Sequence, residues 1–557
     1  MRHDSHTNDE RRRALPLLAL LVGAHVVFAA VFWSTTWDDS AITLAYARTL
    51  AFDGLIAPTR FSSIVEGYST TLWMLLNALL APLAGSPGAT LTTAKILGLA
   101  FNAVAIGLTY RLARLHLDAR FALAVVALFG TLSIAWVESV NGMETPLLAS
   151  LLLLAILAYN KDGTKSHLIF LIASTLFLLV RWEAAWYLVP FVIVTLLRRG
   201  PRGLFRLEHL VWAAGFIGTS LWRHAYFGAW VPNTILAKSH PPYHPDYGLV
   251  ASAIQHAKPL VVIVLALVPL GLGLLAILLS GPNKGERSRI LRGWLRHSAA
   301  DPHRLLVLVV LAGIVFNVAI GHNWGPKNRM FYIAFPPLLI LLVGMARQIY
   351  KAAKRKRRRI IRSIFVASVA LNGLVGLVWA AYAQRNEGIT ISSIAGIAKG
   401  VEAIRLAAGA DRMTYAAADM GALLLFHGDN LRVLDLALLC DSTLARLGYE
   451  AAPAYLFEKE RPDLIETHWM WTPLVGFAEE EAFFRDYVPV FSNGLRFFAR
   501  REVVEAIDTA RLTPGTFDED GDTDAYDRDH FVYSVQLEWD FDLNRRFGSY
   551  LALDAEL

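Results

Sequence analysis

Eleven long apolar runs constrain the fold of this chain more than any other feature. A helix that crosses the hydrocarbon core of a bilayer, about 30 Å thick, needs roughly 20 apolar residues. Only 18% of the residues are charged, against about 25% in an ordinary soluble domain. We therefore expect a polytopic α-helical membrane protein of about eleven transmembrane helices. The runs cover residues 14–34, 92–112, 120–137, 144–160, 166–182, 184–197, 208–226, 258–280, 304–321, 330–346 and 363–382.

Several other classes are excluded. The first run is long and ends in aromatic rather than small residues (Phe32, Trp33), so it is no cleavable signal peptide. The single cysteine, Cys440, rules out an internal disulfide framework and a multi-cysteine metal site. The basic cluster at 351–362 lies between two apolar runs, where it anchors the topology near anionic lipids rather than binding nucleic acid.

The basic residues predict the orientation of the chain in the membrane. They cluster on alternate connections, and cytoplasmic loops carry an excess of Lys and Arg. With every cluster cytoplasmic, the N-terminus lies inside and the chain after residue 383 lies outside the inner (plasma) membrane. The clusters lie at 11–13, 111–120, 161–165, 198–206, 284–304 and 351–362.

Two segments are expected to lie outside the bilayer. Residues 35–90 form the first external loop, whose apolar stretches we interpret as interfacial helices; a further transmembrane pair is the alternative. Residues 385–557 are polar enough for a soluble extracytoplasmic domain, leaving 1–384 as the transmembrane domain. In this tail, strands at 412–418, 431–436 and 462–468 with a helix at 420–427 indicate an α/β fold.

The first external loop opens with two adjacent carboxylates, Asp38 and Asp39. Neighbouring carboxylates repel each other, and partial burial raises at least one of their pKa values. Such a pair suits a general base. The structural alternative is that Asp38, Asp39 or Ser40 is the N-cap of an interfacial helix over 41–52.

Further polar residues are expected at the outer ends of the helices, where charged groups face a cavity or pair with one another. An Arg181–Glu183 ion pair is the structural alternative there. Cations on the outer side break the positive-inside trend and suit a phosphate, with snorkelling at the interface as the alternative. The candidate substrate-cavity residues are Glu66, Tyr68, Trp73, Glu144, Arg181, Glu183, Asn233, Lys238, His322, Lys327 and Arg329.

The ordered motifs of the chain resemble a known family. The segments are Asp38-Asp39-Ser40-x-Ile42…Tyr46-Ala47-Arg48, Val65-Glu66-Gly67-Tyr68-Ser69…Leu72-Trp73, Gly142-Met143-Glu144-Thr145-Pro146-Leu147 and Pro232-Asn233-Thr234…Lys238, followed in the tail by Ala418-Asp419-Met420-Gly421-Ala422, Val433-Leu434-Asp435-Leu436 and Arg461-Pro462-Asp463. Together they resemble the GT-C superfamily of membrane glycosyltransferases, specifically terminal arabinofuranosyltransferases of the AftB type from mycobacterial cell-wall assembly. The chain departs from that pattern at Ala45, where the family has arginine.

The resemblance implies a GT-C fold and transfer of D-arabinofuranose from a decaprenyl-phosphate donor to a glycan acceptor. The acidic residue that such enzymes place in the active site from the first external loop then falls on Asp38 or Asp39. Glu66, Tyr68 and Trp73 belong to the wall of that loop, and the cations face the donor phosphate. A carboxylate with Lys and Arg can supply the chemistry without a cofactor, although a divalent cation bridging the two aspartates is an alternative.

Rival functions also stay open at this stage. A hexosyltransferase that uses polyprenyl-phosphate mannose would share the same motifs. A lipid-linked sugar transporter predicts charges along a path and internal repeats, whereas the charges here gather at one face and no repeat is found. The third rival is a structural envelope protein whose outer domain binds glycan.

Overall fold

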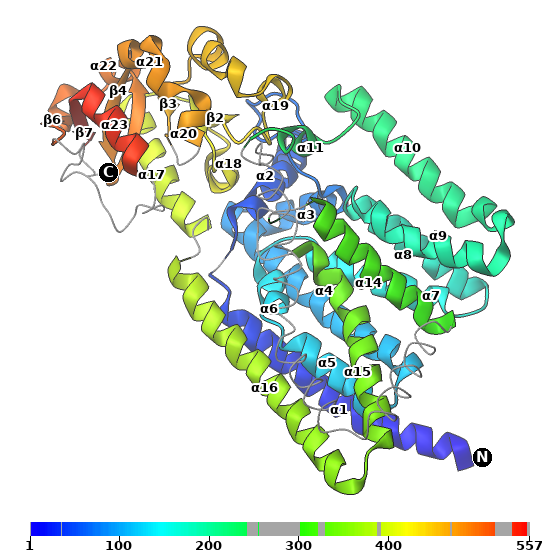
Figure 1. Ribbon diagram of the computed structural model, residues 1–557. Coiled ribbons are helices and arrows are strands. Elements are labelled where there is room, and N and C mark those ends of the chain that lie inside the picture. The colour runs from blue at the N-terminus through cyan, green and yellow to red at the C-terminus, as the bar shows by residue number, and fades with distance from the viewer. Residues whose placement is uncertain are drawn as a thin grey trace. The chain divides into compact units, whose positions relative to one another are not determined.

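The chain divides into two compact units, each assembled from three separate segments (Figure 1). The structure is a computed structural model that describes residues 2–34, 36–241, 254, 301–320, 329–386, 391–467, 471–518 and 537–553. The helical unit comprises Met1–Thr35, Ala94–Gly218 and Tyr247–Asn386. The sheet unit comprises Thr36–Thr93, Thr219–Asp246 and Glu387–Leu557. The first external loop and the tail, which the sequence places far apart, therefore belong to one unit.

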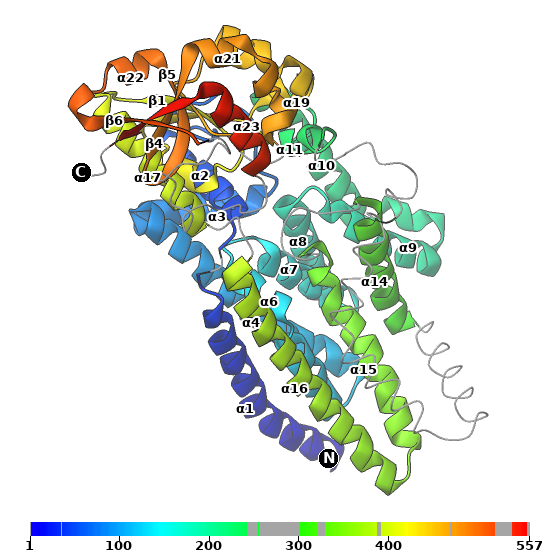
Figure 2. The same ribbon diagram turned by 60° about the vertical axis from the view of Figure 1, so that its left-hand side comes forward.

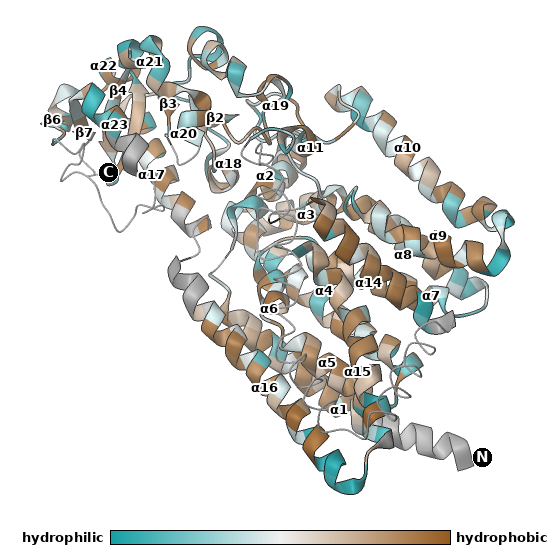
Figure 3. Cartoon of the chain, viewed as in Figure 1, coloured by the Kyte–Doolittle hydropathy of each residue, from teal (hydrophilic) through white to brown (hydrophobic). Residues whose placement is uncertain are grey.

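Apolar helices build the helical unit. Apolar residues dominate α14 and α15, and the basic cluster lies at the N-terminal end of α16 (Figure 3). Helices α4 and α10 begin in one unit and end in the other. The helices are α1 (Arg2–Val31), α4 (Pro87–His116), α5 (Ala119–Gly130), α6 (Ser133–Val140), α7 (Thr145–Tyr159), α8 (Thr164–Val180), α9 (Ala184–Arg199), η1 (Pro201–Phe205), α10 (Leu207–Phe227), α14 (Asp301–Ile320), η2 (Arg329–Ala334), α15 (Phe335–Ala352) and α16 (Arg355–Asn386).

Ten of the eleven predicted apolar runs coincide with helices, and the eleventh, 258–280, lies outside the described residues. Among the described residues, five helices are long and apolar enough to cross a membrane, and a bent pair gives a sixth. Helix α7 has only 15 residues, which at about 1.5 Å per residue is shorter than the hydrocarbon core. The chain is thus a mainly helical, multi-pass membrane protein, while eleven crossings and the orientation stay predictions.

One predicted run is broken in the structure. The sequence predicts a continuous segment over 120–137, but α5 and α6 meet at a 64° bend. Two side chains stabilise the break, because Trp136 Nε1 donates to the carbonyl of Gly130 at 2.7 Å and the ring of His25 contacts the same carbonyl at 3.0 Å. A carbonyl bonded to side chains replaces the helical hydrogen bond that the bend removes.

A mixed seven-stranded sheet forms the core of the sheet unit. Its strand order is β2-β1-β3-β5-β4-β7-β6, with β1 parallel to both β2 and β3. Strands β4 and β5 form a hairpin whose turn residues, Asn493 and Gly494, both have positive φ, as the tightest hairpin turns require. The strands are β1 (Met413–Ala417), β2 (Leu431–Asp435), β3 (Leu464–Ile465), β4 (Tyr487–Ser492), β5 (Leu495–Arg500), β6 (Leu512–Thr516) and β7 (Ser549–Leu553).

Helices complete the sheet unit, and two of them belong to the first external loop. Helix α2 packs against α3 and α18, and α17 packs against α18 and β4. Helices α2, α3 and α17 and strand β4 can be followed in Figure 2. The helices are α2 (Asp38–Asp53), α3 (Thr71–Ala84), α11 (Asn233–Ala237), α17 (Ile391–Ala407), α18 (Gly421–His427), α19 (Ser442–Leu447), η3 (Tyr449–Ala451), the π-helical η4 (Ala454–Glu460), α20 (Trp471–Val475), η5 (Phe477–Glu479), α21 (Glu481–Asp486), α22 (Arg501–Glu505), η6 (Thr509–Arg511) and α23 (Leu537–Phe547).

The α/β pattern predicted for the tail is confirmed. Strands β1, β2 and β3 and helix α18 all fall within the segments that the sequence predicts. The loop over 35–90 contains two helices, as expected, and α3 with 14 residues is too short for an ordinary crossing. Whether these helices lie at a membrane interface stays a prediction.

Candidate active site

Asp38 is the first residue of α2 and is buried. Its carboxylate accepts two backbone hydrogen bonds from the start of α18: Gly421 N–H donates to Oδ2 at 2.6 Å and Ala422 N–H donates to Oδ1 at 2.7 Å. The first N–H groups of a helix lack partners within it. Asp38 therefore caps a helix of the tail, while α2 itself has Trp37 at its N-cap and no side-chain capping bond.

The position of Gly421 shows how closely these elements meet. A Cβ atom at this residue would lie 2.1 Å from the backbone oxygen of Asp38 and 2.8 Å from its Oδ2. Real Cβ atoms do not approach so closely, so only glycine fits without a shift of the backbone. The glycine therefore permits the two hydrogen bonds that hold the Asp38 carboxylate.

The electrostatic surroundings of Asp38 favour its protonated form. Burial and the negative charge of Asp419 raise the pKa of Asp38 well above its ordinary value, although the N–H groups of Gly421 and Ala422 act in the opposite direction. Asp435 resembles it, since burial also raises its pKa while the N–H groups of Ala437 and Cys440 oppose the rise.

Asp39 differs from its neighbour in exposure. It occupies the next position in the first turn of α2, and its side chain is exposed. Successive helical residues point about 100° apart, so one carboxylate faces α18 while the other reaches solvent. Of the two aspartates, Asp39 is thus the more accessible from solvent.

Glu66 forms a buried bidentate ion pair with Arg223 of α10. Arg223 Nη2 donates to Glu66 Oε1 at 3.1 Å, and Arg223 Nε donates to Oε2. The two side chains are only 5% and 2% exposed. Burial raises the pKa of Glu66, and the bonds and charge of Arg223 partly oppose that rise. The sequence predicts Glu66 as a site residue but not its partner.

Tyr68 and Trp73 are both buried in the sheet unit, and Tyr68 interacts electrostatically with Glu66 and Arg223. The Tyr68 hydroxyl has no hydrogen-bond partner among the described residues, and its ring meets that of Tyr46 edge-on, with centroids 4.9 Å apart. Trp73 is 1% exposed in α3. Both therefore contribute to the packed core of the external loop.

Asn233 and Lys238 lie at the two ends of α11. The amide of Asn233 is buried and donates to three backbone carbonyls of the tail, those of Leu438, Leu439 and Asp441, at 2.9, 2.8 and 3.3 Å. Its own backbone N–H donates to the carbonyl of Glu66 at 3.1 Å. Lys238 is exposed at the C-cap. Asn233 thus connects the external loop to the tail.

The helical unit holds a separate ion group. Arg181 Nη1 donates to Glu144 at 2.6 Å and Arg181 Nη2 to Glu183 at 3.0 Å, while Arg181 Nε reaches Glu183 at 3.4 Å. All three nitrogens of this buried guanidinium are engaged. The arrangement contains the Arg181–Glu183 pair of the structural alternative and adds Glu144 to it. A role for the three residues in substrate binding stays a prediction.

Arg329 is buried at the start of η2 in the same unit. Its Nη1 contacts the sulfur of Met143 at 2.6 Å, and it interacts electrostatically with the fully buried Glu138. The other two predicted residues of its loop, His322 and Lys327, lie outside the described residues. The phosphate-binding role of this loop stays a prediction.

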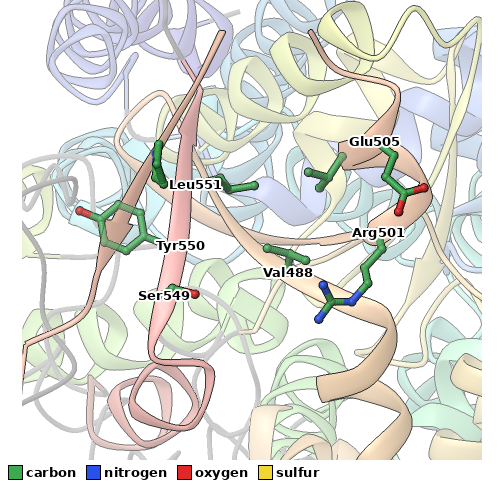
Figure 4. A pocket seen from close by; sticks show the side chains of 8 residues that line it. Val488, Arg501, Glu505, Ser549, Tyr550 and Leu551 are labelled. Atoms are coloured by element: carbon green, nitrogen blue, oxygen red, sulfur yellow. The ribbon is translucent and has the colours of Figure 1, made fainter. Parts of the chain in front are cut away.

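The candidate site residues do not line the pocket shown in Figure 4. No group of three His, Cys, Asp or Glu side chains that could hold a metal ion occurs in the described part of the chain. The pocket, of about 250 Å³, lies in the tail between α22 and the strands β4, β6 and β7 (Figure 4). It is lined by Val488, Arg501, Val504, Glu505, Pro514, Ser549, Tyr550 and Leu551.

The sequence analysis did not include three charged residues among the candidate site residues. Arg223 lies inside the apolar run 208–226, and Glu138 follows the run 120–137. A charge in or beside an apolar segment is a functional signal in a membrane protein, so both were detectable. Asp419 occurs in a tail motif, but only the fold reveals its effect on Asp38.

Comparison with solved structures identifies the fold of this chain. No protein-family model and no curated protein matches the chain. Apo ArnT from Cupriavidus metallidurans is similar with a TM-score of 0.52 and 13% identity, over 81% of this chain and 93% of that one. The apo oligosaccharyltransferase of Archaeoglobus fulgidus is similar with a TM-score of 0.51 and 11% identity, over 87% and 74%. At these identities the likeness shows the fold alone, and it agrees with the GT-C-like fold expected from the sequence.

Proposed function

We propose that this chain is a membrane glycosyltransferase that moves a sugar from a polyprenyl-phosphate donor to a cell-envelope glycan on the outer face of the inner membrane. The observation that carries the proposal is the Asp38–Asp39 pair at the start of α2, in a chain whose fold is similar to ArnT and an oligosaccharyltransferase. We favour D-arabinofuranose as the sugar because the ordered motifs resemble those of AftB-type enzymes.

The two aspartates have different roles in this proposal. Asp39 is the general base, because its carboxylate is exposed and can contact an acceptor hydroxyl. Asp38 is a positioning residue, because both of its oxygens accept N–H groups from α18. Its bonds fix the first turn of α2, which sets the direction of the Asp39 side chain.

The reaction needs one base and one stabilised leaving group. The acceptor oxygen forms a bond to the anomeric carbon, and the bond between that carbon and the phosphate oxygen breaks with its electron pair on the phosphate. The hydroxyl proton passes to Asp39. Polyprenyl phosphate leaves with an additional negative charge, which a cation at the outer surface stabilises. Lys238, exposed at the end of α11, is our candidate for that cation.

These roles are filled by side chains, so we propose that transfer requires no metal ion. A chelator then leaves the transfer rate unchanged. Loss of transfer on chelation, restored by Mg²⁺ or Mn²⁺, would instead support a cation that bridges an aspartate and the donor phosphate.

Transfer by the purified protein in detergent tests the proposed function. Decaprenyl-phosphate arabinofuranose and decaprenyl-phosphate mannose are offered in parallel with an arabinan acceptor, and the product is measured by mass spectrometry. We expect transfer from the arabinose donor. Transfer from mannose alone would keep the reaction class and change the sugar, whereas binding of donor without transfer from either would favour a transporter.

A further inference from the structure

Two adjacent tyrosines of the external loop differ in one respect. The hydroxyl of Tyr46 donates to the carbonyl of Val65 at 2.8 Å and accepts the N–H of Gly67 at 2.9 Å. The hydroxyl of Tyr68 has no partner among the described residues, although Tyr68 is only 2% exposed. The two rings meet edge-on. The bonded hydroxyl of Tyr46 and the unbonded hydroxyl of Tyr68 therefore belong to neighbouring side chains.

Arg223 has an unused donor in the same unit. Its Nε and Nη2 atoms bind Glu66, but its Nη1 atom is buried and has no partner within the part of the chain that the structure describes. Glu66 precedes Tyr68 by two residues, and both it and Arg223 interact electrostatically with the Tyr68 hydroxyl. Two unbonded donors thus belong to side chains that interact with one buried carboxylate.

Buried polar atoms without partners are rare in folded proteins, and each costs free energy. Burial raises the pKa of the Tyr68 hydroxyl and the charge of Glu66 adds to the rise, so this hydroxyl stays protonated and able to donate at neutral pH. Arg223 Nη1 can only donate, whereas a tyrosine hydroxyl can donate or accept. The ligand that completes both must therefore present acceptor oxygen.

The charge at this position favours a neutral oxygen over a phosphate. Glu66 already balances the charge of Arg223 through a bidentate contact. A phosphate bound to the same guanidinium would leave a net negative charge buried beside the Glu66 carboxylate, which is unfavourable at low dielectric. A sugar oxygen accepts both hydrogen bonds without adding charge.

We propose that Tyr68 Oη and Arg223 Nη1 donate hydrogen bonds to an oxygen of the donor's sugar, forming a sugar-recognition subsite distinct from the phosphate-binding position. This subsite rests on the proposed function, since it assigns the sugar end of the polyprenyl-phosphate donor. Recognition of this kind gives selectivity, because a ligand without the matching oxygen leaves both buried donors unbonded.

A binding experiment with the full chain in detergent tests the subsite. The ligands are decaprenyl-phosphate arabinofuranose and decaprenyl phosphate without sugar, and the proteins are wild type and Tyr68→Phe. We expect Tyr68→Phe to weaken binding of the sugar-bearing ligand about tenfold, the effect of one lost hydrogen bond. Binding of the sugar-free ligand should stay unchanged, because no contact to phosphate is lost.

Arg223→Lys is a second variant that keeps a positive charge opposite Glu66 but removes the free arm of the guanidinium. We expect the same selective loss. Equal weakening of both ligands in Tyr68→Phe would assign the donors to phosphate and overturn the subsite, and unchanged binding of both would assign them to structural water. If wild type binds neither ligand, the proposed function fails. If wild type binds the donor and both variants keep its preference for the sugar-bearing ligand, only the subsite is overturned.

Discussion

Two buried arginines, Arg181 in the helical unit and Arg223 in the sheet unit, are both paired with glutamate but differ in how completely they are bonded. In the helical unit, all three nitrogens of Arg181 donate to Glu144 or Glu183. In the sheet unit, Arg223 binds Glu66 with two nitrogens and leaves Nη1 unbonded within the described residues. The Arg181 group has no unused donor, so a structural role explains it fully. The unused Nη1 donor of Arg223 calls for a further partner.

The largest expected effect on stability comes from removing either arginine. We expect Arg223→Met and Arg181→Met each to lower the free energy of unfolding by about 3–5 kcal/mol, because each leaves a buried carboxylate unpaired. Denaturant unfolding in detergent measures both. Glu66→Leu combined with Arg223→Met should recover most of the loss, since it removes the unpaired charge; a double variant as unstable as the single one would mean that packing caused the loss.

A smaller effect is expected where α2 meets α18. Gly421→Ala should lower the free energy of unfolding by about 1–3 kcal/mol, because the new Cβ would overlap the backbone oxygen of Asp38. Gly396→Ala in α17 is the matched control, since nothing lies within 4 Å of a Cβ there, and it should stabilise the helix slightly. Equal midpoints for Gly421→Ala and wild type would contradict the close contact.

The pH dependence of stability should follow the buried carboxyls of the sheet unit. Burial raises the pKa of Asp38 above 3.8 in the folded state, so the folded state binds the proton more tightly than the unfolded state. The stabilisation that comes from this tighter proton binding is fully present below pH 3.8. It is lost as the pH rises through the folded-state pKa of Asp38. Asp435 acts in the same direction.

We therefore expect the thermal midpoint of the sheet unit to fall as the pH rises above about 4, and Asp38→Asn to flatten that fall. Asp486 provides the control, because Arg485 lowers its pKa and gives it the opposite sign. Asp486→Asn should leave the decline in place. A midpoint that rises with pH in wild type would show that these carboxyls are not the dominant titrating groups.

The smallest expected effect is that of Tyr68→Phe, and Tyr46→Phe is its matched comparison. Tyr46→Phe removes a hydroxyl with two backbone hydrogen bonds and should cost about 1–3 kcal/mol. Tyr68→Phe removes a hydroxyl without a partner among the described residues and should leave the free energy of unfolding of the ligand-free protein unchanged or slightly higher. Equal losses for both variants would mean that the Tyr68 hydroxyl has a structural partner.

Apolar periodicity and charge made the elements of this chain predictable. The helices follow the apolar runs because length and hydropathy decide whether a segment can be buried in lipid, and β1, α18 and β2 follow the alternation of the tail. The break between α5 and α6 was not predictable, because it depends on hydrogen bonds from Trp136 and His25 to Gly130. Such contacts carry no signal in the apolar pattern.

The candidate site was predictable in its residue types and not in its pairings. The sequence identifies Asp38 and Asp39 as an unusual pair, but their different exposure depends on α18, which begins 383 residues after Asp38. The partner of Glu66 was missed because Arg223 lies 157 residues away. Long-range pairing of this kind is decided by tertiary packing, which a single sequence does not encode locally.

The most direct test compares the transfer rates of Asp39→Asn and Asp38→Asn, each normalised to folded protein. We expect Asp39→Asn to lose about 10²–10⁴-fold in rate with an unchanged thermal midpoint, because the exposed carboxylate supplies the base. Asp38→Asn should lower the midpoint and keep a far larger share of the rate at temperatures where it is folded. Full activity in Asp39→Asn, with activity lost in fully folded Asp38→Asn, would contradict the account.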